Sequence, residues 1–411
     1  MMKKCLTAVL LFASLQTMCA AGDWPQFRGP NRDGKSTETG LLKKWPDGGP
    51  EMLWSYEGLG KGYATVIVAD GIVYTNGVVG KDKHGTLFAF DTDGNLKWKK
   101  NYGPEWSGRN TSSHVPPTFD SPRLYQMSGE CIITCLDAKT GDIIWSVDTV
   151  KKFGAVNLKW GAAEAPLIDG DNVICTPGGK DATMIALDKV TGKTVWTTKG
   201  YSELSAYCSP TLIEWGGKRL ILTMVAKSVI FVDARNGRVL LRIPHTAKYD
   251  ISAVTPIFDR GLLYVTNGYG TRYGGIMYEI APDLSDSEKK WVEKKLDCHH
   301  GGVILHEGHI YGAGSGGWVC PQLATGEVKW EQKGVGKGSV LFADGMLYCY
   351  GERKGELALV KATTAAYQQI SSFKIEKGTG KHWAHPVISD GRLYMRHGQA
   401  LMVYDVRATN N

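Results

Sequence analysis

The chain has 411 residues, of which 43% are hydrophobic and 22% charged, a composition that excludes a largely disordered protein. The formal net charge is +7, but Lys and Arg are scattered along the chain, so no nucleic-acid partner is predicted. Beyond the N-terminal leader, no stretch approaches the roughly 20 apolar residues that a membrane-spanning helix needs.

The chain begins with the pattern of a secretory signal peptide, residues 1–21. Two lysines precede an apolar run, and small residues end the segment. Cleavage after Ala21 would leave residues 22–411 as a periplasmic or secreted protein. The alternative is a lipid anchor at Cys19, although lipoprotein signals prefer smaller residues before that cysteine than this chain has.

Seven of the nine cysteines follow the leader, so export would permit disulfides but leave at least one thiol unpaired. Cys131 and Cys135 are predicted to lie on one strand, roughly 13 Å apart, which is too far for a disulfide. Most of the others stand in apolar strand contexts, as Cys175 does. We therefore expect buried cysteines that pack as small apolar side chains, and the sequence leaves their pairing open.

A turn with the pattern Asp-x-x-Thr-Gly-x-x-x-Trp recurs along the chain. The Asp and Thr side chains can accept hydrogen bonds from the turn backbone, the Gly adopts a positive φ, and the Trp begins the next strand. The copies, some of them degenerate, begin at Asp91, Asp137, Asp188, Asp233 and Gln322. Trp145 and Trp196 are therefore predicted to be structural residues that are buried between neighbouring repeats.

A second pattern, Gly-x-x-Tyr, alternates with the first and opens a hairpin in each repeat. The copies, three of them weak, end at Tyr74, Tyr125, Ile174, Ile221, Tyr264, Tyr311, Tyr348 and Tyr394. These eight repeats each have room for four short strands, which is typical of a propeller blade. The sequence predicts an all-β, eight-bladed β-propeller of four-stranded antiparallel blades in residues 22–411.

The N-terminal strand is predicted to close the ring. The last repeat, about residues 385–406, stops before its outer strand, whereas residues 51–58 form a strand without a partner around Trp54. Pairing the two would complete the last blade and remove a free edge. The alternative is a seven-bladed ring with an appended hairpin. Residues 24–31 are expected to strap the outside of a blade.

These repeats resemble the tryptophan-docking motif of the pyrroloquinoline-quinone-like (PQQ-like) β-propellers, over nearly all of the chain after the leader. Longer strings are similar to those of secreted bacterial members of this family, at residues 23–30, 176–181, 299–302 and 383–386. The resemblance implies the propeller fold. It leaves the function open, because one fold hosts many functions.

Two kinds of relative imply different functions. Quinoprotein alcohol dehydrogenases hold the quinone and a calcium ion in the propeller centre, and many have two adjacent cysteines beside the quinone. This chain has no adjacent cysteines, and no motif matches the catalytic Asp or the calcium ligands of those enzymes. BamB, an outer-membrane assembly lipoprotein, works as a scaffold. This chain resembles BamB in size and blade number but has a poor lipoprotein signal.

The loops that precede the innermost strands are predicted to meet at the mouth of the central channel. Their aromatic and polar side chains suit a small polar or sugar-like ligand. The candidate ligand mouth consists of His114, Trp160, Glu164, Tyr207, His299, His300, Trp383 and His385. With several histidines, the site is expected to respond to pH between about 5 and 8. The alternative is that these side chains only bind one another and plug the channel.

No local spacing of metal ligands is present, so no metal is predicted. The adjacent pair His299 and His300 is a weak signal, because adjacent strand residues point to opposite faces. No catalytic residue and no cofactor are assigned. The preferred function is a non-enzymatic, monomeric propeller that binds a protein partner or a small polar ligand. The alternatives are a PQQ-dependent dehydrogenase with calcium and an outer-membrane assembly scaffold that resembles BamB.

Overall fold

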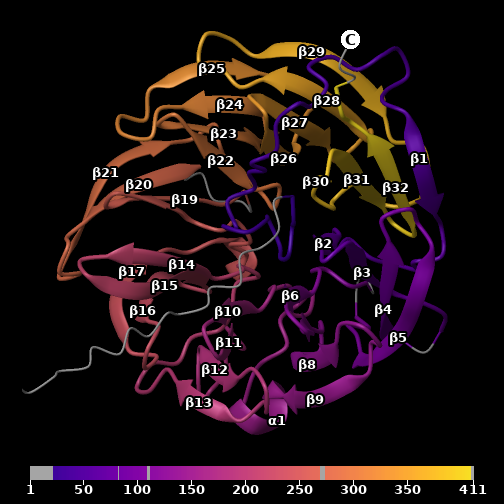
Figure 1. Cartoon of the computed structure of the whole chain (residues 1–411). Helices are drawn as coiled ribbons and strands as arrows, with labels where there is room; N and C mark the ends of the chain where they lie inside the picture. The colour runs from indigo at the N-terminus through magenta and orange to yellow at the C-terminus, as the bar shows by residue number, and fades with distance from the viewer. Residues whose placement is uncertain (1–21, 82, 109–111, 269–273, 409–411) are drawn as a thin grey trace, which may run out of the picture.

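The computed structural model describes residues 22–408, apart from residues 82, 109–111 and 269–273. The predicted signal peptide and Cys19 lie outside the described residues. Eight four-stranded antiparallel sheets stand around a central axis (Figure 1). The predicted eight-bladed propeller is therefore confirmed, and the seven-bladed alternative is excluded. Among the described residues, no helix is long and apolar enough to cross a membrane.

The blades are numbered here in chain order, and each runs outward from a short innermost strand near the axis (Figure 1). Blade 1 consists of β2 (Ile67–Ala69), β3 (Ile72–Val78), β4 (His84–Asp91) and β5 (Leu96–Pro104). Blade 2 consists of β6 (Thr118–Asp120), β7 (Arg123–Met127), β8 (Ile132–Asp137) and β9 (Ile143–Asp148). Blade 3 consists of β10 (Leu167–Asp169), β11 (Asn172–Cys175), β12 (Ile185–Asp188) and β13 (Thr194–Thr197). Blade 4 consists of β14 (Thr211–Trp215), β15 (Lys218–Val225), β16 (Ser228–Asp233) and β17 (Val239–Pro244).

The second half of the ring repeats this order. Blade 5 consists of β18 (Ile257–Asp259), β19 (Leu262–Thr266), β20 (Gly275–Ile280) and β21 (Ser287–Glu293). Blade 6 consists of β22 (Val303–His306), β23 (His309–Gly314), β24 (Gly317–Pro321) and β25 (Val328–Gln332). Blade 7 consists of β26 (Gly338–Ala343), β27 (Met346–Gly351), β28 (Glu356–Lys361) and β29 (Gln368–Lys374). Blade 8 consists of β30 (Val387–Ser389), β31 (Arg392–His397), β32 (Ala400–Asp405) and β1 (Met52–Tyr56). The short helices α1 (Thr149–Phe153) and η1 (Lys248–Asp250) lie between blades.

Blade 8 joins the two ends of the propeller. Strand β1 pairs antiparallel with β32, so that Trp54 lies opposite Val403 and Tyr56 lies opposite Leu401. The predicted closure by the N-terminal strand is confirmed. Strand β1 thereby covers the edge of β32 and completes the four strands of blade 8.

The repeated turn has the predicted local geometry. In blade 2, Asp137 Oδ1 accepts hydrogen bonds from the backbone N–H groups of Lys139 and Thr140, both at 2.9 Å. Gly141 then takes a positive φ of 74°, which a residue without Cβ adopts at no steric cost. The turn therefore directs the outer strand so that its Trp faces the following blade.

At five junctions, a Trp on the outer strand of one blade covers the turn glycine of the next blade. The Trp145 indole Nε1 donates a hydrogen bond to Lys189 O at 3.2 Å, and its ring lies over Gly192. The same contact joins Trp54 to Gly94, Trp98 to Gly141, Trp196 to Gly237 and Trp291 to Gly326. Trp196 is buried, as predicted, whereas Trp145 is only half-buried.

The hydrophobic core is divided among the spaces between neighbouring blades. Between blades 2 and 3, Tyr125 and Cys135 pack with Val173 and Leu187. The seven described cysteines are all buried, as the sequence predicted, and none of them forms a disulfide with another described cysteine. Cys131 precedes β8 rather than lying on it, so it does not share a strand with Cys135.

Residues 22–36 lie inside the ring against the innermost strands of several blades, and we call them the N-terminal plug. Figure 1 shows this indigo segment among the innermost strands. Trp24 exchanges two backbone hydrogen bonds with Val68 of β2, at 2.7 and 3.0 Å. The expectation that residues 24–31 strap the outside of a blade is therefore wrong.

Two buried arginines anchor the N-terminal plug. Arg28 donates to Val303 O of β22 at 2.6 Å. Arg32 donates to the backbone oxygens of Ala165, Pro166 and Pro210, which precede the innermost strands of blades 3 and 4. A guanidinium can be buried here because it satisfies carbonyl groups that strand pairing leaves open near the axis. Burial lowers the pKa of Arg32 to about 10, so the group stays charged at neutral pH.

Candidate ligand-binding pocket

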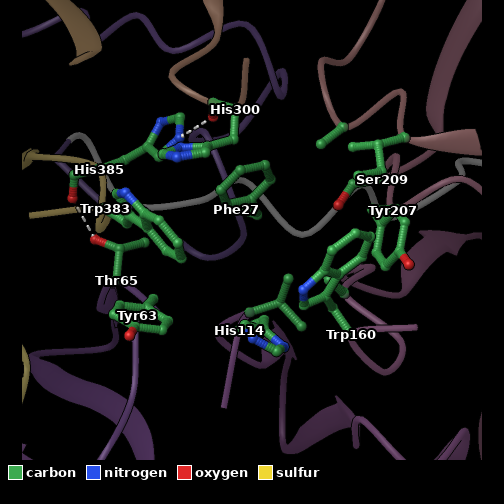
Figure 2. Close-up of a pocket in the computed structure, with 14 residues that line it drawn as sticks. Phe27, Tyr63, Thr65, His114, Trp160, Tyr207, Ser209, His300, Trp383 and His385 are labelled. Atoms are coloured by element: carbon green, nitrogen blue, oxygen red, sulfur yellow. Dashed lines mark hydrogen bonds between the residues drawn. The ribbon is translucent and has the colours of Figure 1, made fainter. Parts of the chain in front are cut away.

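The loops before the innermost strands converge on one pocket at the axis (Figure 2). The pocket has a volume of about 170 Å³, and Phe27 of the N-terminal plug forms part of its wall. The remaining lining residues come from the loops of blades 1 to 6 and blade 8. The propeller thus gathers segments that are far apart in the sequence into one concave site.

Six of the eight sequence-predicted site residues line this pocket. They are His114, Trp160, Tyr207, His300, Trp383 and His385. Each stands a few residues before the innermost strand of its blade, and the ring symmetry brings these positions together. Glu164 and His299 do not line the pocket.

Glu164 is buried within blade 3, behind the residues that line the pocket. Its side chain is buried, and Oε1 accepts a hydrogen bond from the backbone N–H of Thr176 at 2.7 Å. Burial raises the pKa of Glu164 to about 8, although the hydrogen bonds from Thr176 and the charge of Arg32 act in the opposite direction. This carboxyl group is therefore a structural element of the blade rather than a contact for a ligand in the pocket.

His299 lies beside His300 instead of on the opposite face. The two ring centroids are 4.6 Å apart. The rule that adjacent residues point to opposite faces holds for strands, but this pair precedes β22 in a bend. Lys337 Nζ of blade 7 approaches His299 Nδ1 to 3.2 Å. His299 therefore belongs to a polar cluster next to the pocket.

Aromatic side chains form two facing walls of the pocket, as Figure 2 shows. On one side, Trp383 packs against Tyr63 and His300, with ring centroids 4.8 and 5.1 Å apart. On the other side, Trp160 packs against Tyr207 at 6.2 Å. Figure 2 shows Phe27 between these walls. Flat apolar faces thus border the cavity on several sides.

The described lining of the pocket contains no Asp, Glu, Lys or Arg. Burial lowers the pKa of His114 to about 4 and the pKa values of His300 and His385 to about 3. The imidazoles are therefore neutral at pH 7. The sequence analysis expected the pocket histidines to titrate between pH 5 and 8. Burial shifts their titration to lower pH, because the charged imidazolium form loses its hydration in the pocket.

Neutral polar groups complete the lining. His385 Nε2 donates to His300 O at 2.9 Å, and Thr65 Oγ1 donates to His385 O at 2.6 Å. Ser209 borders the cavity from blade 4, whereas the Tyr207 hydroxyl points away from the cavity and only its ring contributes to the wall, as Figure 2 shows. The pocket can therefore offer uncharged hydrogen-bonding groups beside its aromatic faces.

Phe27 and Tyr63 are lining residues that the sequence analysis missed. Tyr63 could have been found by register, because it lies eleven residues before Tyr74, the last residue of its Gly-x-x-Tyr pattern. The same offset applies in other blades to His114, His300 and Trp383. Phe27 carried no comparable signal, since the N-terminal plug lies outside the repeats.

Comparison with protein families gives a match over residues 83–332 to the PQQ_2 family, whose description is outer membrane protein assembly factor BamB. The chain belongs to the PQQ_2 family. A comparison with curated protein sequences gives no significant match.

Solved structures show the same fold as this PQQ_2 propeller. BamB from Moraxella catarrhalis is 15% identical with a TM-score of 0.60, and the match covers 88% of this chain and 99% of BamB. Quinohemoprotein alcohol dehydrogenase from Comamonas testosteroni is 14% identical with a TM-score of 0.68, covering 95% of this chain and 81% of the enzyme. The computationally designed protein Ika8 is 11% identical with a TM-score of 0.60, covering 87% of this chain and all of Ika8 (100%). Such low identities establish the fold alone.

The pocket of this PQQ_2 propeller does not fit pyrroloquinoline quinone. The quinone carries three carboxylates, yet the described lining offers no Lys or Arg to bind them. Arg28 and Arg32 lie nearby but donate to backbone oxygens of the blades. The described lining also lacks a carboxylate of the kind that calcium prefers and lacks a cysteine.

Proposed function

We propose that this PQQ_2 propeller is a non-enzymatic, secreted or periplasmic binding protein whose axial pocket holds a small uncharged polar ligand of the saccharide class. The observation that supports the proposal is the composition of the pocket. Facing aromatic walls around Trp160 and Trp383 are combined with neutral hydrogen-bonding groups. The described lining contains no Asp, Glu, Lys or Arg, and its histidines are neutral at pH 7.

A sugar ring matches these features chemically. The C–H face of a pyranose is apolar and packs on an aromatic ring, whereas its hydroxyl groups need donors and acceptors around the rim. His114 and Ser209 offer such groups. The pocket volume of about 170 Å³ gives room for a sugar ring.

Calorimetric titration of the purified chain with neutral mono- and disaccharides tests the proposal. Glucuronate and glucosamine serve as charged counterparts of similar size. We expect a neutral sugar to bind, and the charged analogues to bind at least about tenfold more weakly, because their charge would lose water without finding a counter-ion. Binding of the charged analogues in preference to the neutral ones would contradict the proposal.

Variants then locate the site. Trp160→Ala and Trp383→Ala should each weaken binding by about tenfold or more while the melting temperature changes little, because both indoles are only half-buried. Val195→Ala is the control, since this side chain is exposed on the outer strand β13. Unchanged affinity in both Trp variants would place the ligand elsewhere.

The second candidate function is a scaffold that binds a protein partner. The description of the matching family as an outer-membrane assembly factor favours it. Exposed apolar residues on the outer strands β9 and β13, namely Ile143, Ile144 and Val195, offer surface for such contacts. Binding assays with purified barrel-assembly components distinguish the two functions. A scaffold would bind them through its rim, and Trp160→Ala combined with Trp383→Ala would leave that binding unchanged.

A further inference from the structure

A cluster of metal-ligating side chains lies between blades 6 and 7, next to the pocket. His299, His300 and Glu352 each offer one ligand atom, and these atoms all lie within 4.8 Å of one another. The histidines precede β22, and Glu352 follows β27. Sequence spacing could not reveal this set, because its members come from different blades.

The backbone holds the two blades in close contact at this point. Val340 N of blade 7 donates to Gly301 O at 3.2 Å. A Cβ built on Gly301 would lie 1.8 Å from Gly338 O, so only glycine permits this approach. Glu352 N donates to Lys337 O at 2.9 Å, which fixes the chain that carries the carboxylate. The donor set therefore rests on rigid backbone.

The orientation of His300 points to a missing partner. Its Nε2 is buried and makes no hydrogen bond with any described residue. The nearest carboxylate oxygen, Glu352 Oε2, is 3.6 Å away, which is too long for a hydrogen bond. A buried polar nitrogen without a partner costs free energy. An ion bound between this nitrogen and the carboxylate would satisfy both.

The cluster already accommodates one positive charge. Lys337 Nζ lies 3.0 Å from Glu352 Oε1 and 3.2 Å from His299 Nδ1. The ammonium group thus contacts two of the three candidate ligands in this structure. A metal ion at the cluster would compete with Lys337 for them.

We propose that His299, His300 and Glu352 bind a divalent transition-metal ion such as Zn²⁺, which displaces the ammonium group of Lys337. Two imidazoles and one carboxylate are ligands that zinc and its neighbours in the first transition row accept. Three protein ligands leave a further coordination position for water or another small ligand. Because His300 also lines the axial pocket, the ion would lie at the pocket wall.

Titration of the full metal-free chain with Zn²⁺, and with Co²⁺ as a spectroscopic probe, tests the site without any sugar ligand. We expect one equivalent to bind. His300→Ala and Glu352→Gln should weaken Zn²⁺ binding by about tenfold or more. His84→Ala is the control, because this side chain is exposed and lies in blade 1. Circular dichroism verifies that each variant is folded.

The variant Lys337→Met separates competition from a structural role. If the ammonium competes with the metal, its removal should tighten Zn²⁺ binding, by about tenfold for the loss of one charge-assisted contact. The proposal is overturned if the wild-type chain binds no Zn²⁺, if folded His300→Ala and Glu352→Gln bind it like the wild type, or if Lys337→Met binds it more weakly. The result does not depend on whether a saccharide binds, so it can be separated from the proposed function.

Discussion

The ring of Phe27 packs edge-on against the imidazole of His385, with centroids 5.2 Å apart and planes at 66°. The contact joins the N-terminal plug to blade 8, so opposite ends of the chain meet at the pocket. His385 in turn donates to His300 O of blade 6. The N-terminal plug therefore forms part of the pocket wall.

The anchoring of the plug by Arg32 is the first prediction. Arg32→Met should destabilise the protein by about 3 kcal/mol, because it leaves three buried carbonyl groups without a donor. Arg260→Met is the matched control, since 88% of that side chain is exposed, and it should stay within about 0.5 kcal/mol of the wild type. Urea denaturation measures both. Equal stability of the two variants would show that the plug does not depend on Arg32.

The docking of Trp145 on Gly192 gives the second prediction. Gly192 and Gly71 have similar positive φ values, 69° and 72°, so an alanine at either position suffers similar backbone strain. An added Cβ would lie 2.8 Å from the Trp145 ring at Gly192 but meets nothing within 4 Å at Gly71. Gly192→Ala should therefore destabilise the protein by about 2 kcal/mol more than Gly71→Ala. Thermal denaturation of the pair measures the difference, and identical melting temperatures would refute the docking contact.

The buried carboxyl group of Glu164 gives a prediction on pH. Burial raises its pKa from 4.5 to about 8 in the folded chain. Its contribution to stability is full below pH 4.5 and is lost as the pH rises toward 8, because the unfolded chain releases the proton first. Glu164→Gln cannot ionise and should remove this part of the decline.

Denaturation at pH 5 and pH 8 measures the effect of Glu164→Gln. The variant should lose less stability between these pH values than the wild type does. Glu214→Gln is the control, because 65% of the Glu214 side chain is exposed. A variant that follows the wild-type curve would mean that Glu164 is ionised in the folded chain throughout this range.

The mismatch between the pocket and the quinone gives the last prediction. Adding PQQ with Ca²⁺ to the purified chain should produce no stoichiometric quinone absorbance band and no dye-linked alcohol oxidation. The physical reason is that the described lining has no cation for the three carboxylates of the quinone. Stoichiometric uptake of the quinone together with alcohol oxidation would restore the dehydrogenase interpretation.

The sequence by itself determined the propeller. The Asp-Thr-Gly turns and the Gly-x-x-Tyr hairpins are local devices, so their chemistry is readable without neighbours. The eight copies of the Gly-x-x-Tyr hairpin predict the number of blades, and the strand without a partner around Trp54 predicts the closure. Register also predicts which loops face the axis. An offset of eleven residues from the hairpin tyrosine marks pocket residues such as His114, His300 and Trp383.

Only the tertiary structure decided how the pocket is closed off, how its histidines are charged and which side chains lie beside it. The N-terminal plug has no periodic pattern, and its place in the channel depends on backbone carbonyls that only the assembled ring brings together around Arg28 and Arg32. The charge state of the pocket histidines depends on burial, which no single repeat encodes. The approach of Glu352 to His300 depends on two blades packing side by side. Contacts and desolvation between repeats arise only when the ring is closed, which is why they lie beyond local sequence patterns.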